Sequence, residues 1–404
     1  MTMPKTIAIA GALDTKGEEF KFLKDEIERR GHRTFVIDTG VVGESAFKAD
    51  ISNEEIAKAG GTSIETLKAR DDRGEAIDAM ARGIAEIIQI IHANGTIDGI
   101  ISMGGSAGTA VGTSAMRALP VGFPKVMVST VAAGDAAHYV GIKDVVMIPS
   151  VVDVAGINRI SRQIFANAAG AIVGMVETGT LEAEDKPLIT ASMFGNTTEA
   201  VDQARAIMER HGYEVLIFHC TGAGGRTMEG LISEGLIEGV LDITTTEWAD
   251  ELAGGVLSAG PTRLDAAGKA GIPQVIVPGC LDMVNFWAPD TVPEKYQARQ
   301  LHKWNPGITL MRTDVEENIH LGKIIAEKAN AATGPVAIFL PLKGVSILDS
   351  PGNEYWWPEA DQALFDAIKS NIRSDIPVIE MDCNINDPEF AEAVTGQLLE
   401  YLGK

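Results

Sequence analysis

The stretch KTIAIAGALDTKGEEFKFLKDEIERRGHRTFVIDTG, residues 5–40, decides the fold class of this chain. It begins with a short apolar run, passes through a polar turn, and continues into a segment that places Phe20, Leu23 and Ile27 on one helical face. Gly31 ends that segment, and a second apolar run follows. Short apolar runs separated by helices are typical of a parallel sheet covered on both faces. The stretch therefore predicts an α/β fold.

The same order of elements returns in KPLITASMFGNTTEAVDQARAIMERHGYEVLIFHCTG, which starts at Lys186. Gly31 and Gly212 correspond at an offset of 181 residues, and Thr15 then corresponds to Asn196. Further along, IDGIISMGGSAGT resembles IEGVLDITTTEWAD, and PKVMVST resembles IPQVIVPGC. Four matched segments in the same order predict two doubly wound parallel-sheet halves that are related by an internal repeat.

The boundary between the halves is expected in the stretch ETGTLEAEDKP, where the apolar pattern stops and acidic residues cluster. We therefore assign residues 1–182 to the first domain and residues 183–404 to the second. The first half also contains a longer polar insertion, from Val42 to about Gly74, that the second half lacks. We interpret this insertion as a flap or an oligomer contact.

Composition excludes several classes of function. The net charge of −22 repels phosphate backbones and anionic membranes, so neither nucleic acid nor lipid is an expected partner. No uninterrupted apolar stretch of ~20 residues predicts a membrane span, and the first residues are interpreted as a buried strand rather than a signal peptide. Three widely spaced cysteines form neither a disulfide framework nor a zinc motif, which favours a cytoplasmic location.

A glycine-rich loop after the apolar run IDGIISM is the first candidate site. Its residues are Gly104, Gly105, Ser106, Ala107, Gly108 and Thr109. Glycine permits close approach of a phosphate to the main chain, and a helix start supplies N–H donors; the two hydroxyls could add contacts. The loop is neither a Walker A motif nor a dinucleotide fingerprint. The alternative is that its small residues only let a helix pack closely on the sheet.

The loop after the first apolar run is the second candidate site, with Asp14, Thr15 and Lys16. Asp14 or Thr15 is expected to cap the following helix, and Glu18 stands three residues after Thr15, as in a capping box. Capping leaves Lys16 without a role, and a lysine at a strand end can meet a phosphate as a point charge.

The third candidate is the loop HCTGAGGR, which begins at His219 and ends at Arg226 and which combines glycines with a cation for a second anion site. His219 itself is interpreted as a buried histidine unless neighbouring strand ends supply partners. Acidic, basic and amide side chains at those strand ends could form an acid/base or metal site with it. They are Glu247, Asp250, Arg263, Asp282, Asn285 and His302.

These loops resemble those of a known family. The segments GALDTKGEE, GGSAGT, HCTGAGGRTMEGLI, DITTTEWADELAGGVLSAGPTRL and PLKGVSILDSPGNEYWWPEAD follow one another along essentially the whole chain. Together they are similar to the Tm-one-like ATP-binding domain family, named for the N-terminal domain of the tomato mosaic virus resistance protein. Its bacterial members form an uncharacterised protein family.

The resemblance implies two Rossmann-like subdomains, ATP as the bound cofactor with or without Mg²⁺, and self-association as a homodimer or higher homo-oligomer. It implies that the Gly104–Thr109 loop and the Asp14–Lys16 loop contact ATP. Relatives tend to have Gly-Gly-Ser-Gly-Gly-Thr where this chain has Ala107, a small change. The plant protein continues into a barrel-like domain, so a separate barrel protein is an allowed partner.

Three functions therefore stay open from the sequence. The first is an ATP-binding protein, in one version an enzyme that uses ATP on a small metabolite in a site between the subdomains. The second is a non-enzymatic interaction module that nucleotide stabilises, since the chain shows no nucleophile motif. The third is a hydrolase or isomerase that acts on an anionic metabolite without ATP, because Arg226, Arg263 and His302 suit such anions equally well.

Overall fold

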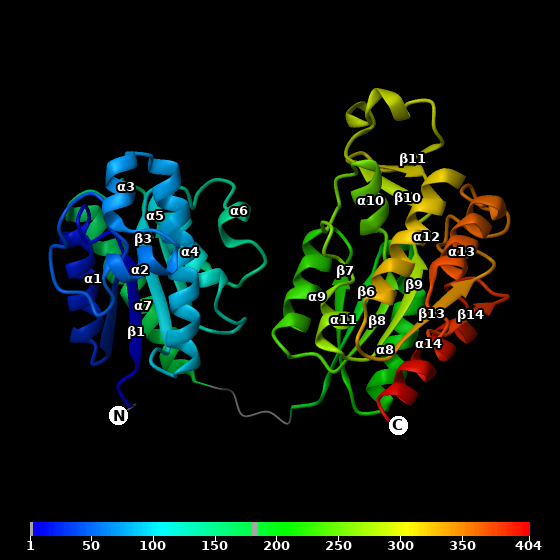
Figure 1. Ribbon diagram of the computed structural model, residues 1–404, viewed down its shortest axis with the longest axis horizontal. Helices are drawn as coiled ribbons and strands as arrows, with labels where there is room; N and C mark the ends of the chain where they lie inside the picture. Colours follow the sequence, from blue (N-terminus) through cyan, green and yellow to red (C-terminus); the bar gives the residue numbers. More distant parts are fainter. Residues whose placement is uncertain (1–2, 180–184) are drawn as a thin grey trace. The chain divides into compact units, whose positions relative to one another are not determined.

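The computed structural model describes residues 3–179 and 185–404, which fall into two compact units, Met1–Ala183 and Glu184–Lys404. Figure 1 labels the elements of each unit. The domain boundary that we placed between residues 182 and 183 lies outside the described residues.

Unit 1 contains a five-stranded parallel sheet. Its strands are β1 (Thr6–Gly11), β2 (Arg33–Asp38), β3 (Gly99–Gly104), β4 (Lys125–Ser129) and β5 (Val146–Pro149). They lie in the order β2-β1-β3-β4-β5, and every neighbouring pair is parallel. In a doubly wound sheet of this order, the direction of winding reverses between β1 and β3. The loops that leave the carboxyl ends of these two strands therefore diverge and leave room for a ligand.

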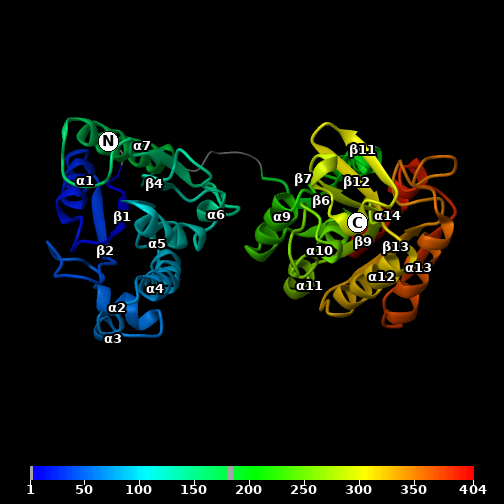
Figure 2. The same ribbon diagram turned by 90° about the horizontal axis from the view of Figure 1, so that it is seen from above.

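Helices cover both faces of this sheet (Figure 2). One face packs against α1 (Gly17–Arg29) and α7 (Arg159–Thr178), and Ile7 and Ile9 point toward it. The other face receives Ala8 and Ala10 from the same strand. It is covered by α2 (Asn53–Ala59), α3 (Ile64–Arg70), α4 (Arg73–Ala93) and α5 (Ser106–Arg117), and the short α6 (Ala137–Val140) follows β4. The strands are apolar on both faces because both faces are buried.

The predicted first helix is confirmed, but its predicted cap is wrong. Phe20, Leu23 and Ile27 are all fully buried, and Gly31 adopts φ of 90°, a left-handed conformation that glycine accepts without strain. The N-cap residue is Lys16, and no side chain caps this helix start. Neither Asp14 nor Thr15 therefore serves as the expected cap, and Asp14 is used in a contact with a distant loop.

The helices of the insertion, α2 and α3, pack on unit 1 rather than forming a flap, and an oligomer contact by the insertion stays a prediction. The apolar residues of α2 and α3 are buried in the same core cluster as those of α4. Gly83 makes this packing possible, because a Cβ atom there would lie 1.9 Å from the carbonyl oxygen of Ile56. Gly60 lies equally close to α4, with 2.1 Å between its would-be Cβ and the Ala79 oxygen. Two glycines thus let α2 and α4 approach at main-chain distance.

Unit 2 contains a six-stranded parallel sheet and a small antiparallel one. The parallel strands are β6 (Leu188–Met193), β7 (Glu214–His219), β8 (Gly239–Thr244), β9 (Gln274–Gly279), β13 (Val336–Pro341) and β14 (Val378–Met381). Their order is β14-β13-β9-β8-β6-β7. The small sheet has the order β10-β12-β11, with β10 (Met283–Phe286), β11 (Leu301–Asn305) and β12 (Ile308–Arg312). Figure 1 shows it beyond the ends of the parallel strands.

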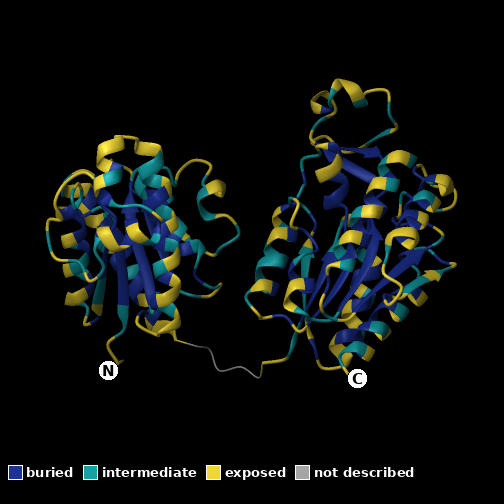
Figure 3. Cartoon of the chain, in the orientation of Figure 1, coloured by how far each residue is buried: buried dark blue, intermediate teal, exposed yellow. Residues whose placement is uncertain are grey.

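The parallel sheet of unit 2 is also covered on both faces, so its strands consist largely of buried residues (Figure 3). The helices α8 (Thr198–Arg210) and α14 (Pro388–Tyr401) pack on one face. The other face carries α9 (Ala223–Ser233), α10 (Glu247–Ala253), α11 (Ala266–Ala270), α12 (Val315–Asn330) and α13 (Pro358–Asn371).

The internal repeat is confirmed at the level of single residues. The offset of 181 residues carries Gly17–Arg29 onto Thr198–Arg210 and Arg33–Asp38 onto Glu214–His219. Gly212 has φ of 90°, as Gly31 does. The α/β fold with two Rossmann-like doubly wound halves is thus present, and the winding of unit 2 reverses between β6 and β8. Among the described residues, no helix combines the length and apolar character that a membrane span requires.

Gly83→Ala is expected to destabilise unit 1 by about 1–3 kcal/mol, because the added methyl group overpacks the contact with α2. Gly174→Ala is the matched control, since a Cβ at this exposed helical position meets nothing within 4 Å. It should stabilise by about 0.5–1 kcal/mol through a smaller entropy loss on folding. Urea unfolding of both variants measures the difference, and equal effects would contradict the packing described for α2 and α4.

Candidate functional site

A cavity of ≈ 720 Å³ lies at the carboxyl ends of β1, β2 and β3, beside the point where the winding of unit 1 reverses. This volume falls within the range of about 300–1,000 Å³ that small-molecule sites occupy. Its walls come from the loops after these strands, from the insertion, and from the first turns of α4 and α5. The site therefore belongs to unit 1 alone.

The glycine-rich loop opens into this cavity. β3 ends at Gly104, Gly105 is the N-cap of α5 without a side-chain cap, and Ala107 and Gly108 line the cavity. Within the described residues, the main-chain N–H groups of Ser106, Ala107 and Gly108 have no acceptor. Such a row of free donors at a helix start attracts anions, because their partial positive charges add up.

Thr109 supports this loop instead of facing a ligand. Its side chain is fully buried, and its hydroxyl lies 2.8 Å from the Gly105 oxygen and 2.6 Å from the Ser129 hydroxyl. Our expectation that this hydroxyl adds a ligand contact is therefore wrong. Ser106 is exposed, so its hydroxyl stays accessible.

The Asp14–Lys16 loop contributes one residue to the cavity, Thr15. Asp14 accepts hydrogen bonds from the main-chain N–H groups of Val42 and Gly43, at 2.7 and 3.0 Å, and so fixes the start of the insertion. The Lys16 ammonium group donates to the Val154 oxygen. Lys16 is thus engaged within the protein, toward the core beneath α1 and α7, and does not line the cavity.

Two cations that the sequence analysis missed line the cavity. Lys68 lies near the end of α3 and Arg73 begins α4, and neither has an ion pair or side-chain hydrogen bond with any described residue. Asp71 and Asp72 lie between them in the chain, and Asp72 caps α4 by accepting from the Glu75 N–H group at 3.0 Å. In the sequence, the break between α3 and α4 was the signal that could have pointed to these two cations.

The remaining wall of the cavity is apolar. It is formed by Val41, Leu67, Ile77, Met80 and Val111. An apolar wall opposite a row of N–H donors and two free cations suits a molecule with a flat or aliphatic body and an anionic end.

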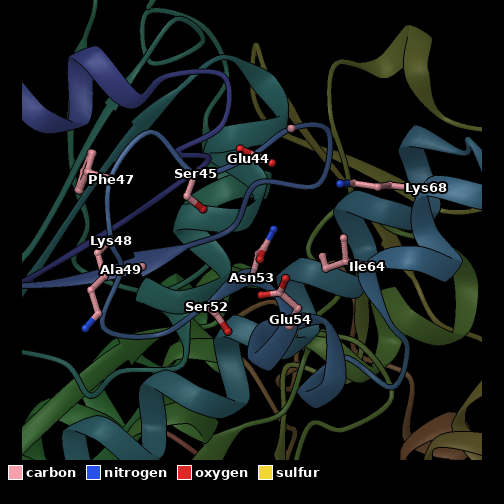
Figure 4. A pocket seen from close by; sticks show the side chains of 11 residues that line it. Glu44, Ser45, Phe47, Lys48, Ala49, Ser52, Asn53, Glu54, Ile64 and Lys68 are labelled. Carbon is pink, nitrogen blue, oxygen red and sulfur yellow. The ribbon is translucent and has the colours of Figure 1, made fainter.

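A second hollow of ≈ 510 Å³ adjoins the insertion (Figure 4). Lys68 lines both hollows, whereas Lys48, Glu44 and Glu54 belong to this one only. Its charges, like those of the first cavity, are mixed in sign, but no uncapped helix start opens into it, because the Ser52 side chain caps α2.

In unit 2, the glycine-rich loop after β7 already contains an anion. The Glu247 carboxylate accepts from the N–H groups of Gly222 and Gly225, at 2.8 and 3.0 Å, and from Arg263 Nε at 2.7 Å. A Cβ at Gly225 would lie 2.0 Å from Glu247, so only glycine leaves room for the carboxylate. Arg226 donates to the Ser258 oxygen at 3.0 Å. This loop is therefore filled by its own protein, contrary to our expectation of a second anion site.

Arg263 is the centre of a buried ion network. Asp242 binds it through both oxygens, at 2.6 and 2.5 Å, and Glu229 lies 3.2 Å away. Burial disfavours the charge on Arg263, but Asp242 and Glu247 raise its pKa well above the ordinary value. Glu247 and Arg263, which we expected as catalytic groups, thus contact each other in the interior, where each compensates the buried charge of the other.

Asp250 belongs to a separate polar contact with Asn285. Its oxygens accept from the main-chain N–H groups of Leu257 and Asn285 and from the Asn285 amide, at 3.2, 3.1 and 2.7 Å. Burial raises the pKa of Asp250 to about 7. Both residues therefore hold the chain after α10 against β10, which is a structural role.

Of the other three expected residues, His219 ends β7 and Asp282 follows β9, whereas His302 lies within β11 of the small antiparallel sheet. His219 is exposed rather than buried, with its ring centroid 5.3 Å from that of Phe194, and partial burial lowers its pKa. Asp282 is fully buried and accepts from the Ser346 hydroxyl at 2.8 Å. His302 Nδ1 lies 2.6 Å from Glu354 Oε2. The six expected catalytic residues are therefore spread over several clusters rather than one.

Comparison with known proteins settles the family. Residues 5–180 match the N-terminal domain, and residues 186–402 the C-terminal domain, of the Uncharacterised protein family (UPF0261). The chain belongs to the UPF0261 family. The resemblance that we described from the loop segments is thereby confirmed.

The relatives of this UPF0261 chain include bacterial and plant proteins. The UPF0261 protein of Clostridium tetani (strain Massachusetts / E88) is 54% identical over 100% of both chains. The UPF0261 protein RA0729 of Rhizobium meliloti (strain 1021) is 45% identical over 96% of this chain and 97% of that one. The ToMV resistance protein Tm-1(GCR237) of Solanum lycopersicum is 39% identical over 99% of this chain but only 56% of its own length.

Among solved structures, a UDP-N-acetylglucosamine 2-epimerase from Rickettsia bellii aligns with 99% of the UPF0261 chain and 96% of its own. The sequence identity is 10% and the TM-score is 0.24. A similarity at this level supports no statement about a shared site.

Asp250→Asn tests the buried carboxyl group of the UPF0261 chain. With its pKa raised from 3.8 to about 7, wild-type Asp250 keeps a proton that the unfolded state loses, so the free energy of unfolding falls as pH rises through that window. Asparagine has no such titration. As the pH rises from about 5.5 to about 7.5, the free energy of unfolding of the variant should therefore increase by on the order of 2 kcal/mol relative to that of wild type.

Asn285 can accommodate this change by turning its amide, since its Oδ1 has no partner among the described residues. Urea unfolding at both pH values gives the measurement, with the exposed Asp290→Asn as the matched control. If the free energies of unfolding of wild type and Asp250→Asn differ by the same amount at both pH values, Asp250 is already ionised in the folded protein.

Proposed function

We propose that the cavity of unit 1 binds ATP, with its phosphates against the first turn of α5. The observation that carries this proposal is the row of three main-chain N–H groups, at Ser106, Ala107 and Gly108, that lack acceptors within the described chain and belong to a loop lining the cavity. Phosphate oxygens are strong acceptors and fit such a row directly.

The charges of the cavity support an anionic ligand. The chain as a whole carries a net charge of −22, so an anion needs local compensation to bind. Lys68 and Arg73 balance the two acids of the cavity wall, Asp71 and Asp72, and the uncapped helix start of α5 adds a partial positive charge. Asp71, also at the cavity wall, offers the oxygen ligands that Mg²⁺ prefers when it accompanies a triphosphate.

The apolar wall favours a nucleotide over a small phosphorylated metabolite. Val41, Ile77, Met80 and Val111 can pack against an adenine ring, whereas inorganic phosphate or a sugar phosphate would leave them uncovered. This observation favours ATP over the alternative of an anionic metabolite without ATP. Binding alone fits both an enzyme and a nucleotide-stabilised interaction module, and the rate of ATP turnover separates these two.

The family resemblance supports the same ligand. The resemblance drawn from the loop segments implies ATP contacts for the Gly104–Thr109 loop, and two residues of this loop, Ala107 and Gly108, line the cavity. A cytoplasmic location, self-association and a barrel-domain partner stay predictions from the sequence.

Ala107→Asp should abolish ATP binding without unfolding the chain. The new carboxylate would stand at the free N–H groups, as Glu247 stands at those of unit 2, and it would repel the phosphates. An acidic residue in the first turn of a helix is favourable, so the melting temperature should stay equal or rise. Calorimetric titration with ATP and Mg²⁺ measures the affinity, and undiminished binding by the variant would refute the assigned phosphate position.

Arg73→Ala should weaken ATP binding by about tenfold, or about 1.4 kcal/mol, through the loss of one charged contact. Lys58→Ala is the matched control, because Lys58 is exposed on α2 and does not line the cavity. The wild-type chain should bind one nucleotide, since Glu247 fills the glycine-rich loop of unit 2. Binding of two nucleotides per chain, or equal losses of ATP affinity in the two variants, would contradict ATP binding at the cavity of unit 1 alone.

A further inference from the structure

The second hollow of unit 1 has one wall that the protein holds in place by itself. Residues 43–45, which follow β2, form this wall. Asp14 accepts a hydrogen bond from the Gly43 N–H group at 3.0 Å, and the buried Asp38 accepts one from the Ser45 hydroxyl. A segment that is neither helix nor strand is thus fixed by two carboxylates, and a ligand that binds against it orders no loop.

The facing wall comes from the first turns of two helices. Asn53 and Glu54 begin α2, and Ile64 begins α3. The volume between the walls, ≈ 510 Å³, lies within the range of about 300–1,000 Å³ that small-molecule sites occupy. Glu54 and Lys68 are exposed, so solvent enters the hollow directly. It therefore offers both room and access for a small molecule.

Asn53 presents a free acceptor at this wall. Its side chain is only 8% exposed, and its Nδ2 atom donates to the Gly40 oxygen at 2.6 Å. Because that carbonyl needs a donor, the contact fixes the orientation of the amide and leaves Oδ1 without a partner among the described residues. Solvent reaches this oxygen, in contrast to the enclosed Oδ1 atom of Asn196. The wall thus carries one rigidly held, accessible acceptor.

The charged side chains of the hollow do not neutralise one another. They are Glu44, Lys48, Glu54 and Lys68. Within the described part of the chain, none of the four forms an ion pair or a side-chain hydrogen bond. In Figure 4, Lys48 and Lys68 lie at opposite ends of the hollow. Both signs of charge therefore stay available to a ligand.

We propose that this hollow binds an α-amino acid with an apolar side chain. The ammonium group of such a molecule can donate to Asn53 Oδ1 and to the adjacent Glu54, and its carboxylate can accept from Lys68. Phe47 and Ile64, which also line the hollow, supply apolar contacts for the side chain. A plain anion would meet two unpaired glutamates and a plain cation two unpaired lysines, so a zwitterion fits best.

The test uses the full chain without nucleotide and L-leucine as the probe, in ligand-detected NMR and calorimetry. Isocaproate is leucine without its ammonium group, and isoamylamine is leucine without its carboxylate. L-leucine should bind, and each analogue should bind about tenfold more weakly or less, because it loses one charged contact.

Two variants locate the probe. Glu54→Gln and Lys68→Ala should each weaken L-leucine binding by about three- to tenfold. Glu316→Gln is the matched control for the first, because Glu316 is likewise the exposed second residue of a helix with a capping box, α12 in unit 2. Lys58→Ala is the control for the second, because Lys58 is exposed in the last turn of α2 and lines neither hollow.

The proposal is overturned if L-leucine does not bind, if either analogue binds as tightly, or if the two variants lose no more affinity than their controls. Ala107→Asp should bind L-leucine as wild type does, because only Lys68 lines both this hollow and the nucleotide cavity. A loss of L-leucine binding in Ala107→Asp would place the amino acid in the nucleotide cavity and also overturn the proposal. Since the titration contains no ATP, its result is independent of whether unit 1 binds ATP.

Discussion

Main-chain N–H groups at the start of a helix need hydrogen-bond acceptors, and both units depend on how this need is met. A doubly wound sheet sends a helix back from the carboxyl end of each strand, and the first turn of each helix has donors without acceptors in the helix. Unit 2 satisfies two such donors, at Gly222 and Gly225, with the carboxylate of Glu247. Unit 1 leaves those of Ser106, Ala107 and Gly108 to a cavity. The same fold thus produces one closed and one open anion position.

The two halves differ here through one side chain, Glu247, and through the insertion of unit 1, which forms part of the cavity wall. Their first helices and second strands correspond in sequence at a constant offset, as do the left-handed glycines after α1 and α8. At the end of β3, however, the chain continues with Gly105 and Ser106, whereas at the end of β8 it continues toward Glu247. One acidic side chain placed at a helix start is enough to replace an external anion, because it supplies the charge at no loss of translational freedom.

Local pattern was sufficient to predict the fold, the repeat and the position of a glycine-rich loop at a strand end. Apolar periodicity identified the buried face of α1, and small residues after an apolar run identified the Gly104–Thr109 loop. What could not be predicted rests on contacts between distant residues. Asp14 binds amides 28 and 29 positions away, and Glu247 reaches back 25 and 22 positions to the glycines that it fills. Lys68 and Arg73 were missed because packing of the insertion, and not their local sequence, brings them to the cavity.

The distribution of buried charge extends this difference to the chemistry of the two units. In unit 2, Arg263 faces the carboxylates of Glu229, Asp242 and Glu247, and Arg312 faces those of Asp282, Asp349 and Asp361. Each cluster thus holds three acids for one guanidinium, and burial raises the pKa of Asp282 to about 7 and that of Asp361 to about 8. Carboxyl groups with pKa values this high are largely protonated near neutral pH, which lowers the negative charge of the cluster around Arg312. At the cavity of unit 1, Lys68 and Arg73 balance Asp71 and Asp72, so the free N–H groups at the start of α5 are what distinguishes it.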